Sequence, residues 1–174
     1  MTYEEEILKA REEKNAYFKN SSQAPLNEID KVRFKGLNYF SVNKDFRFVV
    51  ELKEYQEKRR VQIITSKGPL QDYIRFGYVE FMLPLVLKNL TVFKQPNSDY
   101  FFIPFKDKTT GKETYEAGRY IEIQHVKDNE YVIDFNTAYN PYCAYCDRWV
   151  CPLTPYENIL DVEISVGEKK YKLD

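Results

Sequence analysis

Three cysteines lie close together near the C-terminal end of the chain and are the first residues whose spacing could do chemistry. Cys143 and Cys146 have the spacing of a zinc knuckle, Cys151 follows, and His125 or Asp147 could supply a fourth ligand. A closed structural zinc site usually combines two paired sets of ligands, and this segment contains one. The sequence therefore predicts no metal site.

Cys143 and Cys151 have other interpretations, and the sequence leaves them open. Both could be small buried hydrophobic residues, or they could form a bridge that staples the segment. A reactive thiol is a further alternative, for which Cys143 is the better candidate. No base is identifiable beside it from the sequence.

A group of carboxylates and carboxamides surrounds the same segment. Asp134 follows a strand-like run, and Glu157 lies at the far end of the segment, with Asn136, Asn140 and Asn158 as neighbouring carboxamides. If the segment folds back, these groups could converge on one cavity and bind a polar ligand or perform acid–base chemistry. Alternatively, the carboxamides satisfy backbone donors and only shape the loop.

Arg119 is the cation with the most distinctive surroundings. It follows Gly118 and is flanked by Tyr115 and Tyr120. This arrangement suits a buried bidentate pair with Asp134, or with a ligand carboxylate or phosphate. An internal ion pair is the commoner outcome for such a residue.

The elements that position these residues can be predicted from hydrophobic periodicity. Thr2 and Glu5 form a capping box, which predicts an amphipathic helix over about residues 3–19 within an N-terminal unit of residues 1–22. A period of two then predicts antiparallel strands in residues 32–135 and in a C-terminal strand within 159–174. The individual strands are expected at 46–53, 61–65, 73–81, 85–93, 100–105, 119–126, 130–135 and 159–166.

The predicted fold is mainly β: a single antiparallel β-barrel or β-sandwich domain over residues 1–174 with the N-terminal amphipathic helix. Residues 136–158 form a long connection that contains three prolines, three cysteines and the only tryptophan. A connection of this length inside a compact domain usually packs on itself and serves a function.

Charge and composition exclude several classes of function. The formal net charge is -1, with 26 Lys and Arg against 27 Asp and Glu, so the chain lacks the excess of basic residues needed for nucleic acid or an anionic membrane surface. One histidine rules out a three-histidine zinc site within the chain. The sequence shows no signal peptide and no membrane span, so we expect a cytoplasmic protein.

Several short motifs together resemble a known family. They are DFNTAYNPYCAY at 134–145, CPLTPYEN at 151–158, FIPFKD at 102–107, GRY at 118–120 and GEK at 167–169. This set resembles the conserved uncharacterised prokaryotic family called domain of unknown function sixteen eighty-four. The resemblance implies no particular activity, cofactor or substrate. It places at signature positions Arg119, Asp134, Asn136, Asn140, Cys143, Cys151, Glu157 and Asn158, whereas Cys146 and His125 are additions of this sequence.

The leading hypothesis for function is binding of a small polar or partly aromatic ligand in a cavity beside residues 134–158. Its predicted ligand-binding residues are Arg119, Asp134, Asn136, Asn140, Cys143, Glu157 and Asn158. One alternative is a hydrolase that uses Asp134 and Glu157, or Cys143. Another is a protein-interaction module that uses the tyrosine-rich residues 139–156. The sequence does not identify a cofactor, an oligomeric state or a catalysed reaction.

Overall fold

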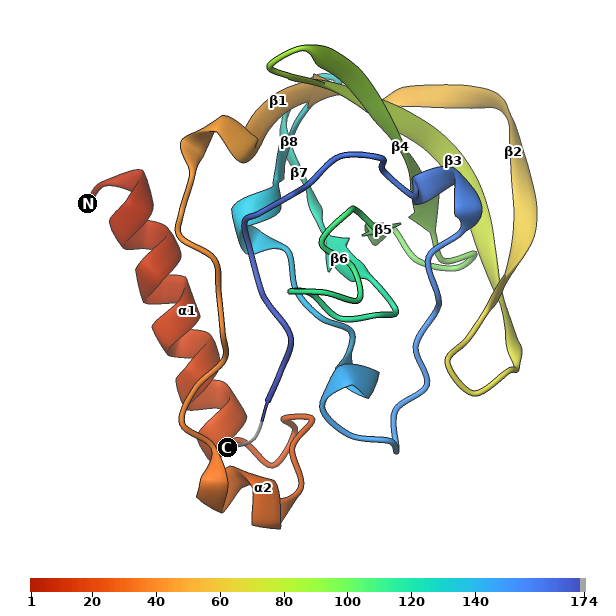
Figure 1. The fold of residues 1–174 in the computed structure, drawn as a ribbon. Coiled ribbons are helices and arrows are strands. Elements are labelled where there is room, and N and C mark those ends of the chain that lie inside the picture. The colour runs from red at the N-terminus through yellow and green to blue at the C-terminus, as the bar shows by residue number, and fades with distance from the viewer. Residues whose placement is uncertain (173–174) are drawn as a thin grey trace.

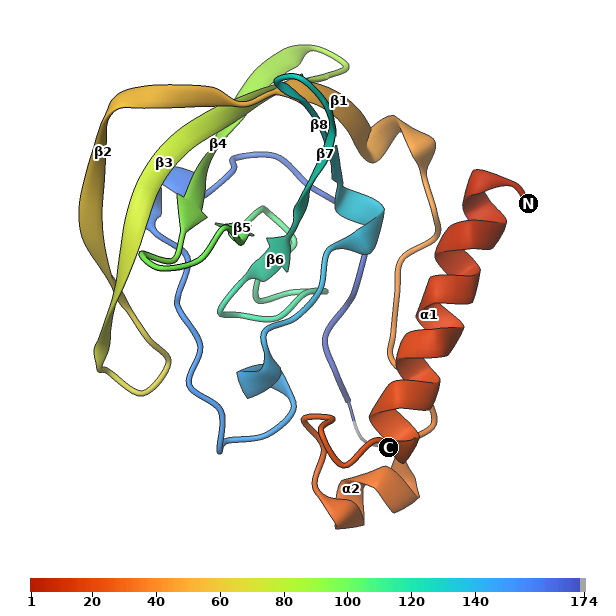
Figure 2. The same ribbon diagram turned by 180° about the vertical axis from the view of Figure 1, so that it is seen from behind.

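A computed structural model of the chain describes residues 1–172; residues 173 and 174 lie outside the described part. Helix α1 (Tyr3–Asn20) begins at the predicted capping box: the Glu5 amide donates to the Thr2 hydroxyl, and the Thr2 amide donates to the Glu5 carboxylate. Its buried residues, Ile7 and Phe18, face the body of the protein. A short helix, α2 (Glu28–Arg33), follows, and both helices lie on the side away from β2 (Figures 1 and 2).

All the strand pairs are antiparallel and form two sheets, as the period-two pattern predicted. The larger sheet has the order β2-β3-β4-β5-β6, and the smaller has the order β1-β8-β7. The sheets do not close on one another, so the arrangement is a sandwich rather than a barrel. The strands are β1 (Arg47–Glu51), β2 (Lys53–Ile64), β3 (Leu70–Leu83), β4 (Val86–Lys94), β5 (Phe101–Phe105), β6 (Arg119–Ile121), β7 (Ile123–Lys127) and β8 (Glu130–Asp134).

The main hydrophobic core lies between the two sheets. Phe135, which follows β8, is fully buried, and its ring centroid lies 5.2 Å from that of Phe81 and 5.3 Å from that of Phe105. Phe81 and Phe105 belong to the larger sheet, so Phe135 joins the layers. Close packing of this kind fixes the end of β8, from which residues 136–158 depart.

The prediction of a C-terminal strand is wrong. Side chains alternate between buried and exposed over 159–166, but these residues form only an isolated bridge, between Lys106 and Ile159. The segment bonds to both backbone and side chains. The Leu160 amide donates to the Lys106 carbonyl, and the Val162 carbonyl accepts from the Lys108 amide. The Ile164 amide donates to the Asp107 carboxylate, and the Ile164 carbonyl accepts from Arg119. The part of the predicted strand at 173–174 lies outside the described residues.

Residues 136–158 pack on themselves with little regular structure, as expected. Three short 3-10 turns interrupt them: Phe135–Thr137, Tyr142–Ala144 and Tyr156–Asn158. Tyr145 from this connection packs edge-on against Phe18 of α1, with ring centroids 4.9 Å apart. The connection therefore lies partly against the helix, and the two enclose a hollow. None of the helices within residues 1–172 is long and apolar enough to cross a membrane.

Candidate functional site

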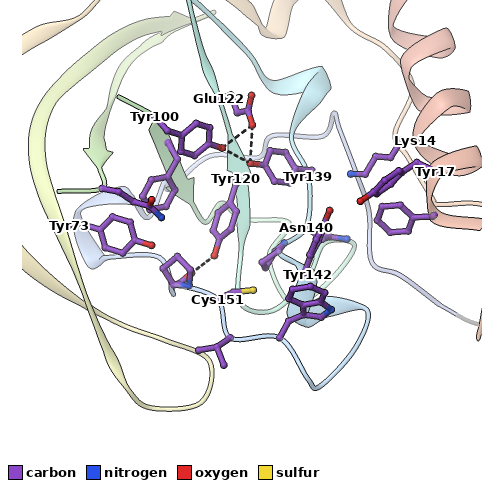
Figure 3. A pocket seen from close by; sticks show the side chains of 17 residues that line it. Lys14, Tyr17, Tyr73, Tyr100, Tyr120, Glu122, Tyr139, Asn140, Tyr142 and Cys151 are labelled. Atoms are coloured by element: carbon purple, nitrogen blue, oxygen red, sulfur yellow. Dashed lines mark hydrogen bonds between the residues drawn. The ribbon is translucent and has the colours of Figure 1, made fainter. Parts of the chain in front are cut away.

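A cavity of about 610 Å³ lies where the C-terminal half of α1, the larger sheet and the long connection meet. We call it the tyrosine pocket (Figure 3). Its lining is mostly aromatic, and five separate parts of the chain contribute to it. The lining residues are Lys14, Tyr17, Phe18, Tyr73, Gln95, Tyr100, Phe102, Tyr120, Glu122, Tyr139, Asn140, Pro141, Tyr142, Trp149, Val150, Cys151 and Pro152.

The aromatic rings of the pocket hold one another in place. Tyr120 lies edge-on to both Phe102 and Tyr139, with centroid separations of 5.8 and 5.9 Å. Tyr142 and Trp149 form another edge-on pair at 5.1 Å. These contacts position the rings through packing, and the backbones of Tyr120 and Tyr139 also exchange two N–H···O hydrogen bonds, at 2.9 and 3.0 Å.

Three phenols of the pocket, those of Tyr100, Tyr120 and Tyr139, are neutral hydrogen-bond donors. Burial raises the pKa of Tyr100 to about 12, and it raises the pKa values of Tyr120 and Tyr139 still further. A phenol with a raised pKa keeps its proton at neutral pH. The hydroxyl of Tyr120 donates to the Pro152 carbonyl, which ties β6 to the connection.

Glu122 carries the unpaired charge of the pocket. The Tyr100 hydroxyl donates to its Oε1 at 2.9 Å, and the Tyr139 hydroxyl does so at 3.5 Å (Figure 3). Within the described residues, no lysine, arginine or histidine nitrogen lies within 4.0 Å of this carboxylate, although the pocket also contains Lys14. Lys14 is paired elsewhere: its ammonium lies 2.8 Å from Glu168.

Two buried polar atoms in the lining have no hydrogen-bond partner. They are Oδ1 of Asn140, a residue 1% exposed, and Nε1 of Trp149. Buried polar atoms are normally paired, because desolvation without a hydrogen bond is unfavourable. The pocket therefore offers one unused acceptor and one unused donor.

Arg119 lies away from the pocket, in a buried group that we call the Arg119 cluster: Arg119, Asp107 and Glu168. Its guanidinium is 1% exposed and donates to the carbonyls of Ile164 and Val166 at 2.8 and 2.5 Å. The internal ion pair expected for Arg119 exists, but its partner is Asp107, at 3.4 Å, and not Asp134. Burial lowers the pKa of Arg119, and the Asp107 carboxylate opposes that shift.

Glu168 is the second charge of the Arg119 cluster. Its carboxylate accepts from Lys14, from Tyr145 and from the Asn140 amide groups. The side chain is fully buried, and burial raises the pKa of its carboxyl while Lys14 acts in the opposite direction. Glu168 lies in the GEK motif at 167–169 but is not among the predicted ligand-binding residues.

Asp134 and Asn136 meet beneath the start of α1. The Asp134 carboxylate accepts from the Tyr3 hydroxyl at 2.7 Å and from the Asn136 amide at 2.9 Å. The Asn136 side chain bonds to both the amide and the carbonyl of Asn43, each at 2.8 Å. These contacts dock the helix and the preceding chain onto the end of β8.

Glu157 and Asn158 lie on the other side of the sandwich. Glu157 accepts three bonds from Arg75, at 3.2, 2.9 and 2.7 Å, and one from the Thr91 hydroxyl. Asn158 is fully buried and bonds to the Thr91 amide and carbonyl and to the Pro104 carbonyl. Glu157 shares no bonding partner with Asp134, so the geometry lends no support to a hydrolase built on these two carboxylates.

Asn140 alone of the seven predicted ligand-binding residues lines the tyrosine pocket in the described chain. Cys143 lies next to it, since its thiol contacts Cys151, which is in the lining. Asn136 and Glu157 line two other hollows. The predicted residues therefore do not share one cavity, and a direct ligand-binding role for them stays a prediction.

No group of three or more His, Cys, Asp or Glu side chains in residues 1–172 is arranged to hold a metal ion. All three cysteines have free thiols, and Cys146 is not among the hydrogen-bond partners of the Cys143 and Cys151 pair. His125 is exposed, on β7.

Sequence reasoning missed most of the pocket, including Tyr73, Tyr100 and Glu122. These residues come from separate strands and loops and have no common motif. The clustering of tyrosines within 139–156 and beside Arg119 was the one signal that pointed to this region.

Comparisons with known proteins identify a protein family and a similar solved structure. A family described as "Protein of unknown function (DUF1684)" matches residues 32–169. The solution structure of an uncharacterized protein from gene locus rrnAC0354 of Haloarcula marismortui is similar, with 33% sequence identity and a TM-score of 0.72. The match covers 96% of this chain and 94% of that one. No curated protein matches the chain.

Proposed function

The chain belongs to the DUF1684 family of proteins of unknown function, and from this premise we propose that it binds a small organic cation with an aromatic or other apolar body in the tyrosine pocket. The family is of unknown function, so the choice of ligand class rests on the pocket. It assigns to Asn140 a direct contact with the ligand. The Arg119 cluster, in contrast, holds the surrounding chain in place.

Size and lining support a small-molecule site. Pockets for small ligands usually measure about 300–1,000 Å³ and are mostly apolar with a few polar groups, and the tyrosine pocket, at about 610 Å³, fits this description. Its rings come from α1, three strands and the long connection, so the fold as a whole constructs it. An apolar or aromatic body would stack on these rings.

The charge balance supports a cation. Lys14 is neutralised by Glu168, whereas Glu122 receives only neutral phenol donors. An ammonium group beside Glu122 would gain an ion pair, and the faces of the neighbouring tyrosine rings attract cations as well. An anionic ligand would face an unpaired carboxylate instead.

The observation that carries the proposal is the pair of unpartnered polar atoms in the lining. Asn140 Oδ1 could accept from an N–H or O–H of the ligand, and Trp149 Nε1 could donate to a ligand oxygen. A ligand that satisfies both atoms removes two desolvation penalties from the protein. This complementarity is the reason to expect specific binding rather than adventitious apolar contact.

Three probes with one skeleton test the ligand class: tyramine as the cation, tyrosol as the neutral alcohol and 4-hydroxyphenylacetate as the anion. Trp149 is the only tryptophan of the chain and lines the pocket, so its fluorescence reports binding directly. We expect tyramine to bind most tightly and 4-hydroxyphenylacetate most weakly. Equal affinities, or an order reversed in favour of the anion, would overturn the cation assignment, and the absence of any saturable change would overturn the binding site.

A matched pair of variants locates the charge recognition. Glu122→Gln removes the carboxylate of the pocket, whereas Glu12→Gln removes an exposed carboxylate of α1 outside the lining. We expect E122Q to weaken tyramine binding about fivefold, the equivalent of about 1 kcal/mol, and to leave tyrosol binding unchanged. E12Q should match the wild type for both probes.

A further inference from the structure

We propose that Cys143 and Cys151 form an oxidisable dithiol, in which Cys143 attacks a hydroperoxide and Cys151 resolves the product to a disulfide. This inference does not depend on ligand binding in the tyrosine pocket. It rests on the contacts of the two thiols, on their unequal exposure and on the way the surrounding chain holds them.

The two thiols lie close enough for each to shift the pKa of the other, although seven residues separate them in the chain. Cys143 belongs to the 3-10 turn Tyr142–Ala144, which follows Pro141. Cys151 is held from the other side: its amide donates to the Ser66 hydroxyl at 3.2 Å, and its carbonyl accepts from the Ser66 amide at 2.9 Å. Two independently anchored backbones therefore bring the sulfur atoms together.

Two hydroxyl groups complete the surroundings of the Cys143 sulfur. The Tyr115 hydroxyl lies 3.8 Å from it, and the Ser66 hydroxyl, which accepts from the Cys151 amide, also lowers the pKa of Cys143. Together with the Cys151 thiol, they can provide three donors to a thiolate at Cys143. Burial raises the pKa of Tyr115, so this phenol keeps its proton while it donates.

This environment favours the thiolate of Cys143. The hydrogen bond from Cys151 lowers the pKa of Cys143 to about 6; Tyr115 and Ser66 add to this effect, and burial opposes it. The same contact, together with burial, raises the pKa of Cys151. At neutral pH the pair therefore consists of a thiolate at Cys143 and a protonated thiol at Cys151, the two forms that an attacking and a resolving cysteine need.

Exposure agrees with these roles. Cys143 is partly exposed and can meet a small oxidant, whereas Cys151 is 9% exposed, in the wall of the tyrosine pocket. Cys146 is also partly exposed but is not a partner of either thiol in the pair. Cys146 is therefore a built-in control for general thiol oxidation.

The chemistry balances with hydrogen peroxide as the oxidant. The Cys143 thiolate attacks one peroxide oxygen, so that an S–O bond forms, the O–O bond breaks, and the other oxygen leaves as hydroxide; the product at Cys143 is a sulfenic acid. The Cys151 sulfur then attacks the Cys143 sulfur, the S–O bond breaks, and the hydroxyl group leaves as water with the thiol proton. The pair loses two electrons, and a dithiol reductant restores both thiols.

The first test compares the pKa values of the Cys143 and Cys146 thiols through the pH dependence of their alkylation rates. The reduced protein is alkylated with iodoacetamide between pH 5 and 9, and peptide mass mapping gives the rate at each cysteine. We expect the rate at Cys143 to have its midpoint near pH 6, well below that of Cys146, and Tyr115→Phe to move the Cys143 midpoint upward without changing Cys146. Identical midpoints at the two cysteines would overturn the proposal.

The second test follows oxidation by one equivalent of hydrogen peroxide with intact mass and peptide mapping. We expect the wild type and Cys146→Ser to lose two hydrogens and form the 143–151 disulfide. Cys151→Ser should instead accumulate a sulfenic acid at Cys143 that dimedone traps. A wild-type protein that stays reduced, or that oxidises first at Cys146, would refute the proposal even if a substituted variant failed to fold.

Discussion

The Arg119 cluster and the tyrosine pocket differ in how completely their polar groups are paired. In the Arg119 cluster, the two terminal nitrogens of the guanidinium make four bonds, to Asp107 and to the carbonyls of residues 164, 166 and 168, and the buried Nε of Arg119 has no hydrogen-bond partner. In the tyrosine pocket, the Asn140 oxygen and the Trp149 nitrogen make none, and the Glu122 carboxylate has no cation within the described residues. Lys14 and Asn140 line the pocket and also bond to Glu168 of the Arg119 cluster. The two regions are therefore neighbours, and the main difference between them is the pairing of their polar groups.

This difference distinguishes two roles of polar groups: some complete the hydrogen bonding of the fold, and others are available to bind a ligand. The Arg119 cluster supplies hydrogen bonds that a neighbouring strand would otherwise make to residues 164–168, so its polar groups complete the fold. Burial of charge is tolerated there because each charge has a partner. Unpaired polar atoms next to an open cavity do not stabilise the fold, and their pairing with a ligand is the natural explanation for them. Substitutions in the two regions should consequently have different consequences.

The largest effect on stability should follow Arg119→Met. The variant leaves the buried Asp107 carboxylate without its cation and three main-chain carbonyls without their donor, so we expect the free energy of unfolding to fall by about 4 kcal/mol. Urea unfolding measures the change. Arg59→Met is the matched control, because Arg59 is exposed and pairs only with exposed Glu57, and its cost should stay below about 0.5 kcal/mol. A cost below about 1 kcal/mol for R119M would break the comparison.

A smaller loss is expected for Glu168→Ala. The substitution removes the acceptor of Lys14, Asn140 and Tyr145, but the Lys14 ammonium is partly exposed and can turn to water. We expect a loss of about 3 kcal/mol in urea unfolding. Glu163→Ala, at an exposed position of the same segment, should change stability by less than about 0.5 kcal/mol. Equal costs for the two variants would show that the cluster does not organise this segment.

The pH dependence of stability should differ between the wild type and the Glu168→Gln variant. Burial raises the pKa of the Glu168 carboxyl, so the folded state holds this proton more tightly than the unfolded state. Its contribution is complete below the unfolded pKa of about 4.3 and is lost as the pH rises through the higher folded pKa. The carboxamide of the E168Q variant cannot titrate in this range, so the stability of the wild type minus that of E168Q should decrease from pH 4 to pH 7. A flat or rising difference would contradict the raised pKa.

The sequence predicts those parts of the fold in which the local pattern and the tertiary contacts agree. Thr2 and Glu5 cap α1 because both partners lie within one turn of the chain. The alternation in 46–53 coincides with β1 because a neighbouring strand, β8, pairs with it. Over 159–166 the same alternation coincides with burial but not with a strand, because the backbone bonds to Lys106 and Lys108 give way at Ile164 and Val166 to bonds with the side chains of Asp107 and Arg119. Hydrophobic periodicity predicts which side chains face the core, but it does not predict which groups bond to the backbone of that segment.

The tyrosine pocket could not be predicted because its geometry is purely tertiary. Tyr73, Tyr100, Tyr120 and Tyr139 come from different parts of the chain and meet only after the larger sheet and the long connection are in place. Motif-based selection favoured Asp, Asn and Glu, whose partners are mostly internal. Among the described residues, Asn140 is the one predicted ligand-binding residue that lines the pocket. It also bonds to Glu168 of the Arg119 cluster.

The smallest effect on stability, and the sharpest contrast with R119M, should come from Trp149→Phe. Nε1 of Trp149 makes no hydrogen bond, so its removal deletes no protein contact and eliminates an unsatisfied donor, while the phenyl ring can retain much of the packing against Tyr142. We expect the free energy of unfolding to change by less than about 1 kcal/mol. Tyramine affinity, measured by calorimetry because the fluorophore is lost, should fall about fivefold through the missing bond to the ligand oxygen, the equivalent of about 1 kcal/mol. A large loss of stability with unchanged affinity would mean that Trp149 serves the fold as Arg119 does, and the distinction between the two regions would disappear.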